Sequence, residues 1–240
     1  MTLDDGIRWL ADQIKKGSVV IFSGAGLSTE SGLKDFRSRD GHWAKFDPAK
    51  LASVDALERN YDEFLAFYKA RLHVPEGVKP NSGHLRVAEW EASGYVTGVV
   101  TQNVDRLHQQ AGSKKVAELH GSLEPVRCHA CGRIHETKSF LDGEKCACGG
   151  RLRPGVVLFG EMLPDDQLDL AEEWTSESKT FIVLGSSLLV SPANYFPRKA
   201  KMHGASLVIV NRDATPLDSI ADLVAHEEIG QYLERVHALM

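Results

Sequence analysis

The residues best suited to chemistry stand in two short segments of the chain, 101–108 and 118–121. The first contains two amides and a carboxylate, Gln102, Asn103 and Asp105, and the second contains an imidazole, His120. The first segment follows a β-branched run that predicts a buried parallel strand, and the second repeats the pattern. Open α/β sheets bind their ligands at the carboxyl ends of such strands. Turn capping would explain any one of these residues, but four together indicate one shared crevice.

A glycine-rich turn follows the β-forming run at 18–23. Small residues at 24–26 let the backbone approach a pyrophosphate, and the first turn of the next helix offers free N–H groups. The usual dinucleotide fingerprint fails, because Thr29 occupies its third glycine position, so this turn alone would be unremarkable. The segment that follows places a carboxylate, an aromatic ring and a guanidinium side by side, which an apolar core does not need: Asp35, Phe36 and Arg37.

Together these segments resemble the signature motifs of the sirtuins, a family of NAD-dependent protein lysine deacylases. The motif segments run through nearly the whole chain in the family's order: 24–28, 32–37, 101–105, 119–121, 153–154, 159–161, 185–188, 190–193 and 210–211. Two positions depart from the family pattern. Lys34 replaces the usual proline and Ser186 replaces the commoner threonine, but neither change removes a reacting group.

The resemblance implies that NAD lies across the strand ends and that the acyl group of an acyl-lysine is transferred to ADP-ribose as nicotinamide leaves. It implies that His120 is the general base on a ribose hydroxyl, a task that suits an imidazole with an ordinary pKa near 6.5, and that Asn103 is catalytic beside it. The NAD contacts it implies are Gly24, Ala25, Gly26, Ser28, Glu30, Asp35, Phe36, Arg37, Gln102, Asn103, Asp105, Gly185, Ser186, Ser187, Asn211 and Ile229.

Three other functions compete with this interpretation. An ADP-ribosyltransferase and a non-catalytic NAD-sensing module would both use the same cofactor site. A short-chain dehydrogenase is suggested by the spacing of Tyr195 and Lys199, although Pro197 between them is tolerated only in the first turn of a helix. Two further histidines, His84 and His108, lie at expected helix starts and are predicted to be structural.

Substrate contacts are expected on two extended segments and one helix. By the resemblance, a peptide adds as a strand between segments that flank the cleft, with contacts from Val157, Phe159, Gly160, Glu161 and Val190. Tyr68 and Arg71 share one helix face and resemble the Tyr-x-x-Arg pattern of sirtuins that remove succinyl and malonyl groups. The alternative is a surface helix whose arginine pairs with Glu63 or with solvent.

All four cysteines fall within 128–148, as Cys128, Cys131, Cys146 and Cys148. This paired arrangement predicts one structural zinc, although the second pair is one residue tighter than is common. Two disulfides are the competing prediction, but a ring closed across one residue would be strained. His129 and His135 could substitute as ligands, yet four thiolates already complete a tetrahedron.

Alternating strands and helices predict an α/β fold, a doubly wound parallel Rossmann-like sheet, with a smaller domain beside it. Strands are expected at 18–23, 96–100, 156–159, 181–184 and 207–210, and a helix around 57–68. The expected boundaries are 1–44, 81–127 and 154–240 for the NAD-binding domain, 45–80 for a helical insertion and 128–153 for the zinc module.

Composition excludes some partners. The net charge of −5 and pI of about 6.1 argue against nucleic-acid binding. No apolar stretch approaches the roughly 20 residues that span a bilayer, and the amino terminus does not resemble a signal peptide. We expect a cytoplasmic monomer that binds acylated lysines of proteins or peptides and no membrane.

Overall fold

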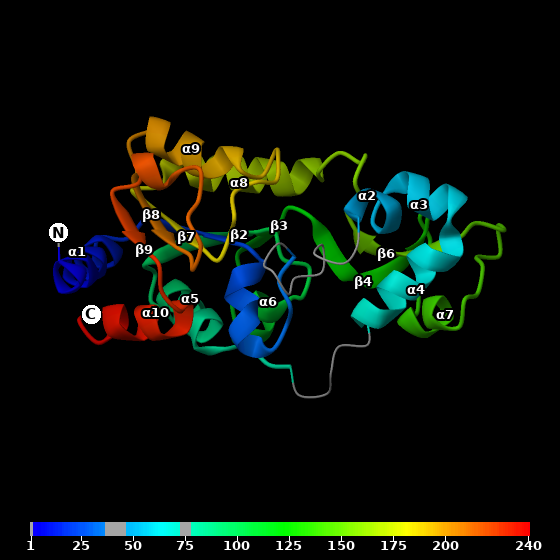
Figure 1. The fold of residues 1–240 in the computed structure, drawn as a ribbon, viewed down its shortest axis with the longest axis horizontal. Helices are drawn as coiled ribbons and strands as arrows, with labels where there is room; N and C mark the ends of the chain where they lie inside the picture. Colours follow the sequence, from blue (N-terminus) through cyan, green and yellow to red (C-terminus); the bar gives the residue numbers. More distant parts are fainter. Residues whose placement is uncertain (1, 37–46, 73–77) are drawn as a thin grey trace.

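The computed structural model describes residues 2–36, 47–72 and 78–240, and its core is a six-stranded parallel sheet (Figure 1). The order β3-β2-β1-β7-β8-β9 reverses direction between β1 and β7, as in a Rossmann sheet. The strands are β1 (Val19–Ser23), β2 (Val96–Thr101), β3 (Val116–Glu118), β7 (Thr180–Leu184), β8 (Ser206–Val210) and β9 (Leu223–Ala225).

Alternate residues of each central strand fill two apolar cores, one on each face of this sheet. Ile21 and Ile182 pack with helices α1 (Leu3–Lys15), α5 (Ser82–Ala92) and α10 (Ile229–His237). Phe22 and Phe181 pack with α8 (Asp165–Glu177) and α9 (Tyr195–Met202) on the opposite face (Figure 1). Burial on both faces explains why β1 and β7 are continuous apolar runs.

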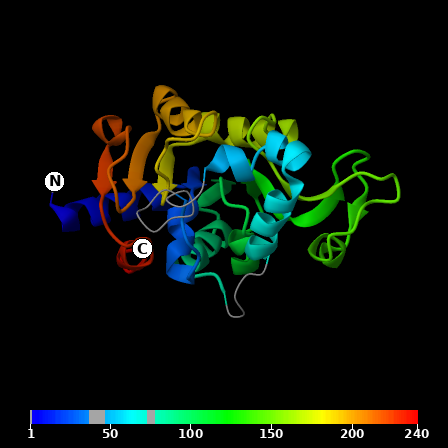
Figure 2. The ribbon, with the colours of Figure 1, turned by 45° about the vertical axis from the view of Figure 1, so that its right-hand side comes forward.

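A smaller domain lies at one end of the molecule, on the side of β2 and β3 (Figures 1 and 2). It contains a three-stranded sheet, β5-β4-β6, covered by helices. Phe64 and Phe140 of these helices pack with Leu152 of the sheet in one apolar core. Its elements are α2 (Pro48–Leu51), α3 (Val54–Arg59), α4 (Tyr61–Leu72), β4 (Gly121–Cys128), β5 (Ile134–His135), α7 (Thr137–Leu141) and β6 (Leu152–Val156). The doubly wound sheet with a smaller domain is therefore confirmed.

Two expectations about this arrangement are corrected. Residues 156–159 are not a strand of the parallel sheet, because β6 ends at Val156 after pairing with β4, and Phe159 then forms only a single bridge with Ser53. Residues 121–127 and 154–156 were assigned to the larger domain, but β4 and β6 pair with each other in the smaller sheet. In this run, Val156 and Leu158 are buried in the core of the smaller domain, whereas Phe159 is 46% exposed.

The remaining connections complete the larger domain. A 3-10 helix, η1 (Ala25–Ser31), follows β1, and the short helix α6 (Leu107–Ala111) follows the 102–106 loop. Another 3-10 turn, η3 (Asp218–Ile220), precedes β9. Within the described residues, no helix is both long enough and apolar enough to cross a bilayer.

Candidate active site

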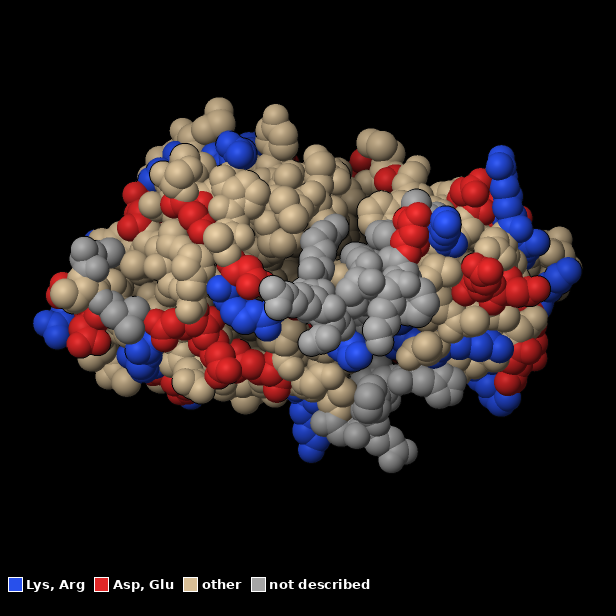
Figure 3. Space-filling model, viewed as in Figure 1, with Lys and Arg blue, Asp and Glu red and all other residues tan. Residues whose placement is uncertain are grey.

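A cleft of about 950 Å³ lies between the carboxyl edge of the parallel sheet and the smaller domain. The surface is hollowed between the two domains (Figure 3). The loops after β1, β2, β7 and β8 line one side of the cleft, and α4 with segment 156–161 lines the other. The cleft therefore sits at the point where the strand order reverses, as the strand-end motifs predicted.

The glycine-rich loop is packed directly against the loop after β7. A Cβ added to Gly24 would lie 2.7 Å from the Gly185 carbonyl oxygen, and one added to Gly26 would lie 2.8 Å from it. Gly185 itself has φ +66, which favours glycine. Only residues without side chains allow this approach, which leaves the backbone of Ala25 and Gly26 exposed to the cleft, where a pyrophosphate fits.

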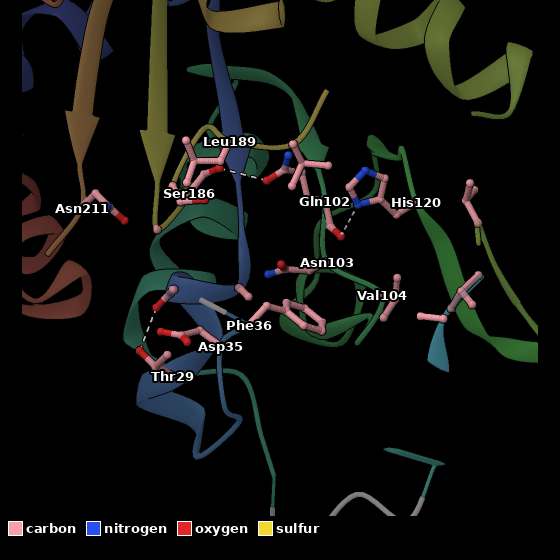
Figure 4. Close-up of a pocket in the computed structure, with 18 of the residues that line it drawn as sticks. Thr29, Asp35, Phe36, Gln102, Asn103, Val104, His120, Ser186, Leu189 and Asn211 are labelled. Carbon is pink, nitrogen blue, oxygen red and sulfur yellow. Dashed lines mark hydrogen bonds between the residues drawn. The ribbon is translucent and has the colours of Figure 1, made fainter. Parts of the chain in front are cut away.

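The loop after β2 presents amide groups to the same cleft (Figure 4). The Ser186 hydroxyl donates to Gln102 Oε1 at 2.9 Å, whereas Gln102 Nε2 is buried without a hydrogen-bond partner. Asn103 is 6% exposed, and its Nδ2 donates to the Gly24 carbonyl at 3.1 Å. A buried donor without a partner is costly, so Gln102 suits a ligand rich in hydroxyl oxygens, such as the ribose of NAD.

His120 stands between β3 and β4 and faces the cleft beside Gln102 (Figure 4). Its Nδ1 lies 3.1 Å from the Gln102 carbonyl oxygen. Because a carbonyl oxygen only accepts, Nδ1 carries the proton, and Nε2 is the basic nitrogen of the ring. The main chain therefore sets the tautomer that a general base requires.

Two predicted NAD residues lie behind this surface. The Asp105 carboxylate accepts from the Ser28 hydroxyl at 2.7 Å and from the Leu107 N–H at 2.9 Å. Ser28 and Asp105 line an adjoining cavity of about 770 Å³ rather than the main cleft. Phe36 and Arg71 line both spaces, so they form part of the wall between them.

Most of the other predicted residues are brought together. The main cleft is lined by the predicted NAD residues Ala25, Gly26, Glu30, Asp35, Phe36, Gln102, Asn103, Gly185, Ser186, Ser187, Asn211 and Ile229, and by the predicted substrate residues Tyr68, Arg71, Val157, Phe159, Gly160, Glu161 and Val190. Gly24 packs behind the loop without lining the cleft, and Arg37 lies outside the described residues.

Sequence reasoning missed several lining residues. Thr29, which breaks the dinucleotide fingerprint, lies in η1 and donates from its hydroxyl to the Gly26 carbonyl at 2.8 Å (Figure 4). Arg212 forms an ion pair with Asp35 at 3.7 Å across the cleft. Leu189 is 60% exposed at the rim, on the extended segment 189–191 that the resemblance placed beside the cleft. The fingerprint position marked Thr29, but no local signal marked Arg212.

The four cysteines converge as predicted. Their sulfurs lie within 4.8 Å of one another, with Sγ–Sγ distances of 3.6 Å for Cys128–Cys148 and 3.7 Å for Cys131–Cys146. Four thiolates about 2.3 Å from a tetrahedral zinc would be about 3.8 Å apart, whereas a disulfide requires about 2.05 Å. All four are free thiols, so the disulfide alternative is wrong and the set fits one structural zinc.

The dehydrogenase alternative fails on position. Tyr195 is 69% exposed on α9, and Lys199 is ion-paired with Glu172 of α8. Neither residue lines the main cleft. Pro197 lies in the first turn of α9, where proline is tolerated.

Comparison with known proteins agrees with this geometry. The Sir2 family model matches residues 24–192. The chain is 51% identical over 231 residues to an NAD-dependent protein deacetylase of Halalkalibacterium halodurans, covering 95% of this chain and 96% of the relative.

Two solved structures are similar over the whole fold. A Sir2 homologue in complex with NAD has a TM-score of 0.87 and 38% identity, covering 96% of this chain and 93% of its own. A Sir2 variant with a deacetylated p53 peptide and 3′-O-acetyl ADP ribose has a TM-score of 0.89 and 36% identity, covering 97% of each chain.

Proposed function

This chain belongs to the Sir2 family of NAD-dependent protein deacetylases, and we propose that its pocket also accepts lysine acyl groups that end in a carboxylate, such as succinyl and malonyl. One observation carries the proposal: Arg71 is half-buried in the wall of the cleft, its Nε is buried without a hydrogen-bond partner, and it forms no ion pair with a carboxylate among the described residues. The alternative pairing with Glu63 is not seen: both residues are described, no ion pair joins them, and within the described part of the chain only Tyr68 and Asp105 act electrostatically on Arg71.

Aromatic rings surround the Arg71 guanidinium. Its central carbon lies 4.8 Å from the ring centre of Phe36 and 5.6 Å from that of Phe67. Its Nε is buried without a hydrogen-bond partner. Burial lowers the pKa of Arg71, although Tyr68 and Asp105 oppose this. A cation in such apolar surroundings is costly unless an anion pairs with it. The carboxylate of an acyl group that enters the cleft would form that pair.

Tyr68 supplies the second group of the proposed pocket. It lies three residues before Arg71 on α4, is 4% exposed and lines the same cleft. Burial raises the pKa of Tyr68 to about 12, so its phenol stays neutral and can donate a hydrogen bond. A guanidinium fork and a phenol together match a carboxylate. A charge-assisted bond contributes about 1.5–3 kcal/mol, or roughly ten- to a hundredfold in discrimination.

The proposed reaction assigns a role to each part of the cleft. When bound, NAD would supply the ribose carbon that the acyl oxygen of acyl-lysine attacks as nicotinamide leaves, and its ADP-ribose would carry the acyl group away on oxygen. Ala25 and Gly26 would hold its phosphates with Gly24 packed behind them, Ser187 and Asn211 its adenosine side, and Asp35 and Phe36 its nicotinamide end. Asn103 and Gln102 would orient the ribose. His120 would take a proton from a ribose hydroxyl at Nε2, the nitrogen left basic by the bond from Nδ1 to the Gln102 carbonyl.

The rim of the cleft suits an extended peptide. Phe159 exchanges main-chain hydrogen bonds with Ala52 and Val54 on its inner edge. Neither Gly160 on this segment nor Leu189 opposite it makes a main-chain hydrogen bond to another described residue. These unused donors and acceptors support a substrate peptide adding as a strand between the two segments.

The proposal is tested by kcat/KM on matched succinyl-, malonyl- and acetyl-lysine peptides. Arg71→Met should lower the efficiency on the two acidic substrates by roughly ten- to a hundredfold and change acetyl-lysine much less. Arg59→Met is the matched control, because Arg59 is exposed on α3 and lies outside the cleft.

An equal loss on all three substrates would count against a carboxylate pocket. Product analysis separates the transferase alternative, which predicts protein-bound ADP-ribose without freed lysine. A sensing module would release neither nicotinamide nor lysine.

A further inference from the structure

Arg153 is the largest charged side chain buried in the molecule's described part, and no role in the reaction has been assigned to it. Its side chain is 0% exposed on β6, the strand that leads directly into the 157–161 segment at the rim of the cleft. Arg153 does not line the cleft itself. Any effect on substrate must therefore pass through the groups that it holds.

All three guanidinium nitrogens of Arg153 donate hydrogen bonds, to two main-chain carbonyls of β6 and to the Glu161 carboxylate in the turn that follows it. Nη2 donates to Glu161 Oε2 at 2.9 Å, and Nη1 donates to Glu161 Oε1. Nη2 also donates to the Val156 carbonyl, and Nε donates to the Pro154 carbonyl at 3.3 Å. The two ends of the segment, Val156 and Glu161, are thus tied to one planar group.

Glu161 closes the turn from the other side. Its Oε2 accepts from the Leu158 N–H at 2.8 Å, and its own N–H donates to the Leu158 carbonyl at 3.0 Å. Burial raises the pKa of Glu161, but the bonds from Arg153 and Leu158 outweigh this and hold it below its ordinary value. The Glu161 carboxylate was expected to contact substrate, yet it is already occupied inside the protein.

These bonds fix the path of the backbone at the edge that a peptide would use. The Val157 N–H donates to the His120 carbonyl at 2.8 Å, and the Phe159 N–H donates to the Ala52 carbonyl at 2.9 Å. These bonds and the Arg153–Glu161 pair hold the residues on either side of Gly160. Gly160 itself is exposed at the rim and has a φ of +96°. Residues with a side chain rarely adopt such a φ, so this position of the turn favours glycine.

We propose that Arg153 is a positioning residue for peptide substrates, which acts through Glu161 to set the backbone of 157–161 in register for strand addition. The inference rests on the proposed docking of peptides at this segment. A buried ion pair is weak evidence of added stability, because apolar replacements of similar volume are often neutral. The position of the Arg153–Glu161 pair next to the edge where a peptide would dock is better explained by the backbone geometry that a bidentate pair fixes.

Two variants test the proposal. Glu161→Gln keeps the side-chain length but weakens the bond to Arg153. The double variant Arg153→Leu with Glu161→Leu removes both charges at once, so no unpaired charge stays buried. Glu172→Gln is the matched control, since it breaks the Lys199 ion pair far from the cleft. Thermal unfolding identifies any variant that does not fold.

Each variant is assayed on an acetyl-lysine peptide and on a single acetyl-lysine with blocked termini, which cannot add as a strand. We expect the KM for the peptide to rise about tenfold, the cost in affinity of losing one or two main-chain hydrogen bonds. The KM for NAD and the kcat/KM on the blocked acetyl-lysine should stay within about twofold of the wild-type values. A change of about twofold corresponds to the smallest net contribution of one hydrogen bond.

The outcomes separate the inference from its premise. If the wild-type enzyme handles the peptide no better than the blocked residue, the docking proposal itself fails. If it prefers the peptide but Glu161→Gln keeps that preference, the role of Arg153 is refuted. Equal losses on both substrates would show a merely structural pair. If the double variant does not fold, the peptide preference of Glu161→Gln decides.

Discussion

Two buried histidines should make this protein sensitive to mild acid. His84 and His108 are 0% and 1% exposed, and their ring centres lie 5.0 Å apart. His108 Nε2 is 2.8 Å from the Ser23 hydroxyl, and His84 Nδ1 is 3.0 Å from Asn81 Oδ1. His84 Nε2 and His108 Nδ1 are buried without hydrogen-bond partners. A second proton on either ring would place a charge in a buried site, where only Asp105 offsets it in part, and only for His84.

Burial therefore lowers the pKa of His84 to about 4, against a smaller opposing effect of Asp105, and lowers that of His108 to about 3. The unfolded chain binds these protons as the pH falls through about 6.5, whereas the folded chain does so only near 4 and 3. Stability is thus full above about pH 6.5 and declines through this window. At pH 5 each histidine lowers the free energy of unfolding by roughly 2 kcal/mol, and the pair by about 4 at most.

Urea unfolding at pH 8 and pH 5 measures this effect. His108→Gln should lose about 2 kcal/mol less than the wild type between the two pH values, even if it is less stable at both. Other titrations, including those of the cysteines, are common to both proteins and cancel in the comparison. His203→Gln is the control, because His203 is exposed and should leave the acid dependence unchanged. Equal acid losses in wild type and His108→Gln would refute the reasoning.

Two further results are expected. His120→Ala should lower kcat by about 10²–10⁴-fold while thermal unfolding stays close to wild type, because the ring is only half-buried at the cleft; a large loss of stability would instead indicate a structural histidine. Chelation should release one zinc per chain and melt the smaller domain, whose core includes Cys128 and Cys146, as followed by a zinc indicator and by thermal unfolding; absence of stoichiometric zinc would contradict the site.

The strands that sequence predicts are those that the sheet buries completely. β1, β2, β7 and β8 are apolar runs because helices cover both faces, so their signal is local. β9 has three residues, two of them partly exposed, and offers no comparable run. The apolar run at 156–159 has the composition of a strand, but Val156 pairs with β4, Val157 bonds to the His120 carbonyl and Phe159 bonds to Ala52 and Val54 of the helical insertion. An apolar run predicts that a segment packs against other parts of the protein, but it does not predict which element it packs against.

The candidate site shows the same division. Residues at strand ends were predictable, because the chain order of a parallel sheet brings its loops to one edge. Long-range partners were not predictable: Asp35 meets Arg212 only when the loops after β1 and β8 converge. Ser28 and Asp105 were assigned to one crevice with their neighbours, yet their mutual hydrogen bond turns them toward the adjoining cavity.

Arg153 and Arg71 differ in whether the protein itself balances the charge of the guanidinium. Arg153 has a carboxylate and two carbonyls for its three nitrogens, so its charge is balanced within the protein. Arg71 has two aromatic faces, a buried nitrogen without a partner and no ion-paired carboxylate among the described residues. Leaving a buried charge unpaired costs several kcal/mol. A ligand carboxylate that pairs with such a charge at the wall of a cleft would recover part of this cost as binding free energy. The same electrostatic rule thus supports a positioning role for Arg153 and an acyl-binding role for Arg71.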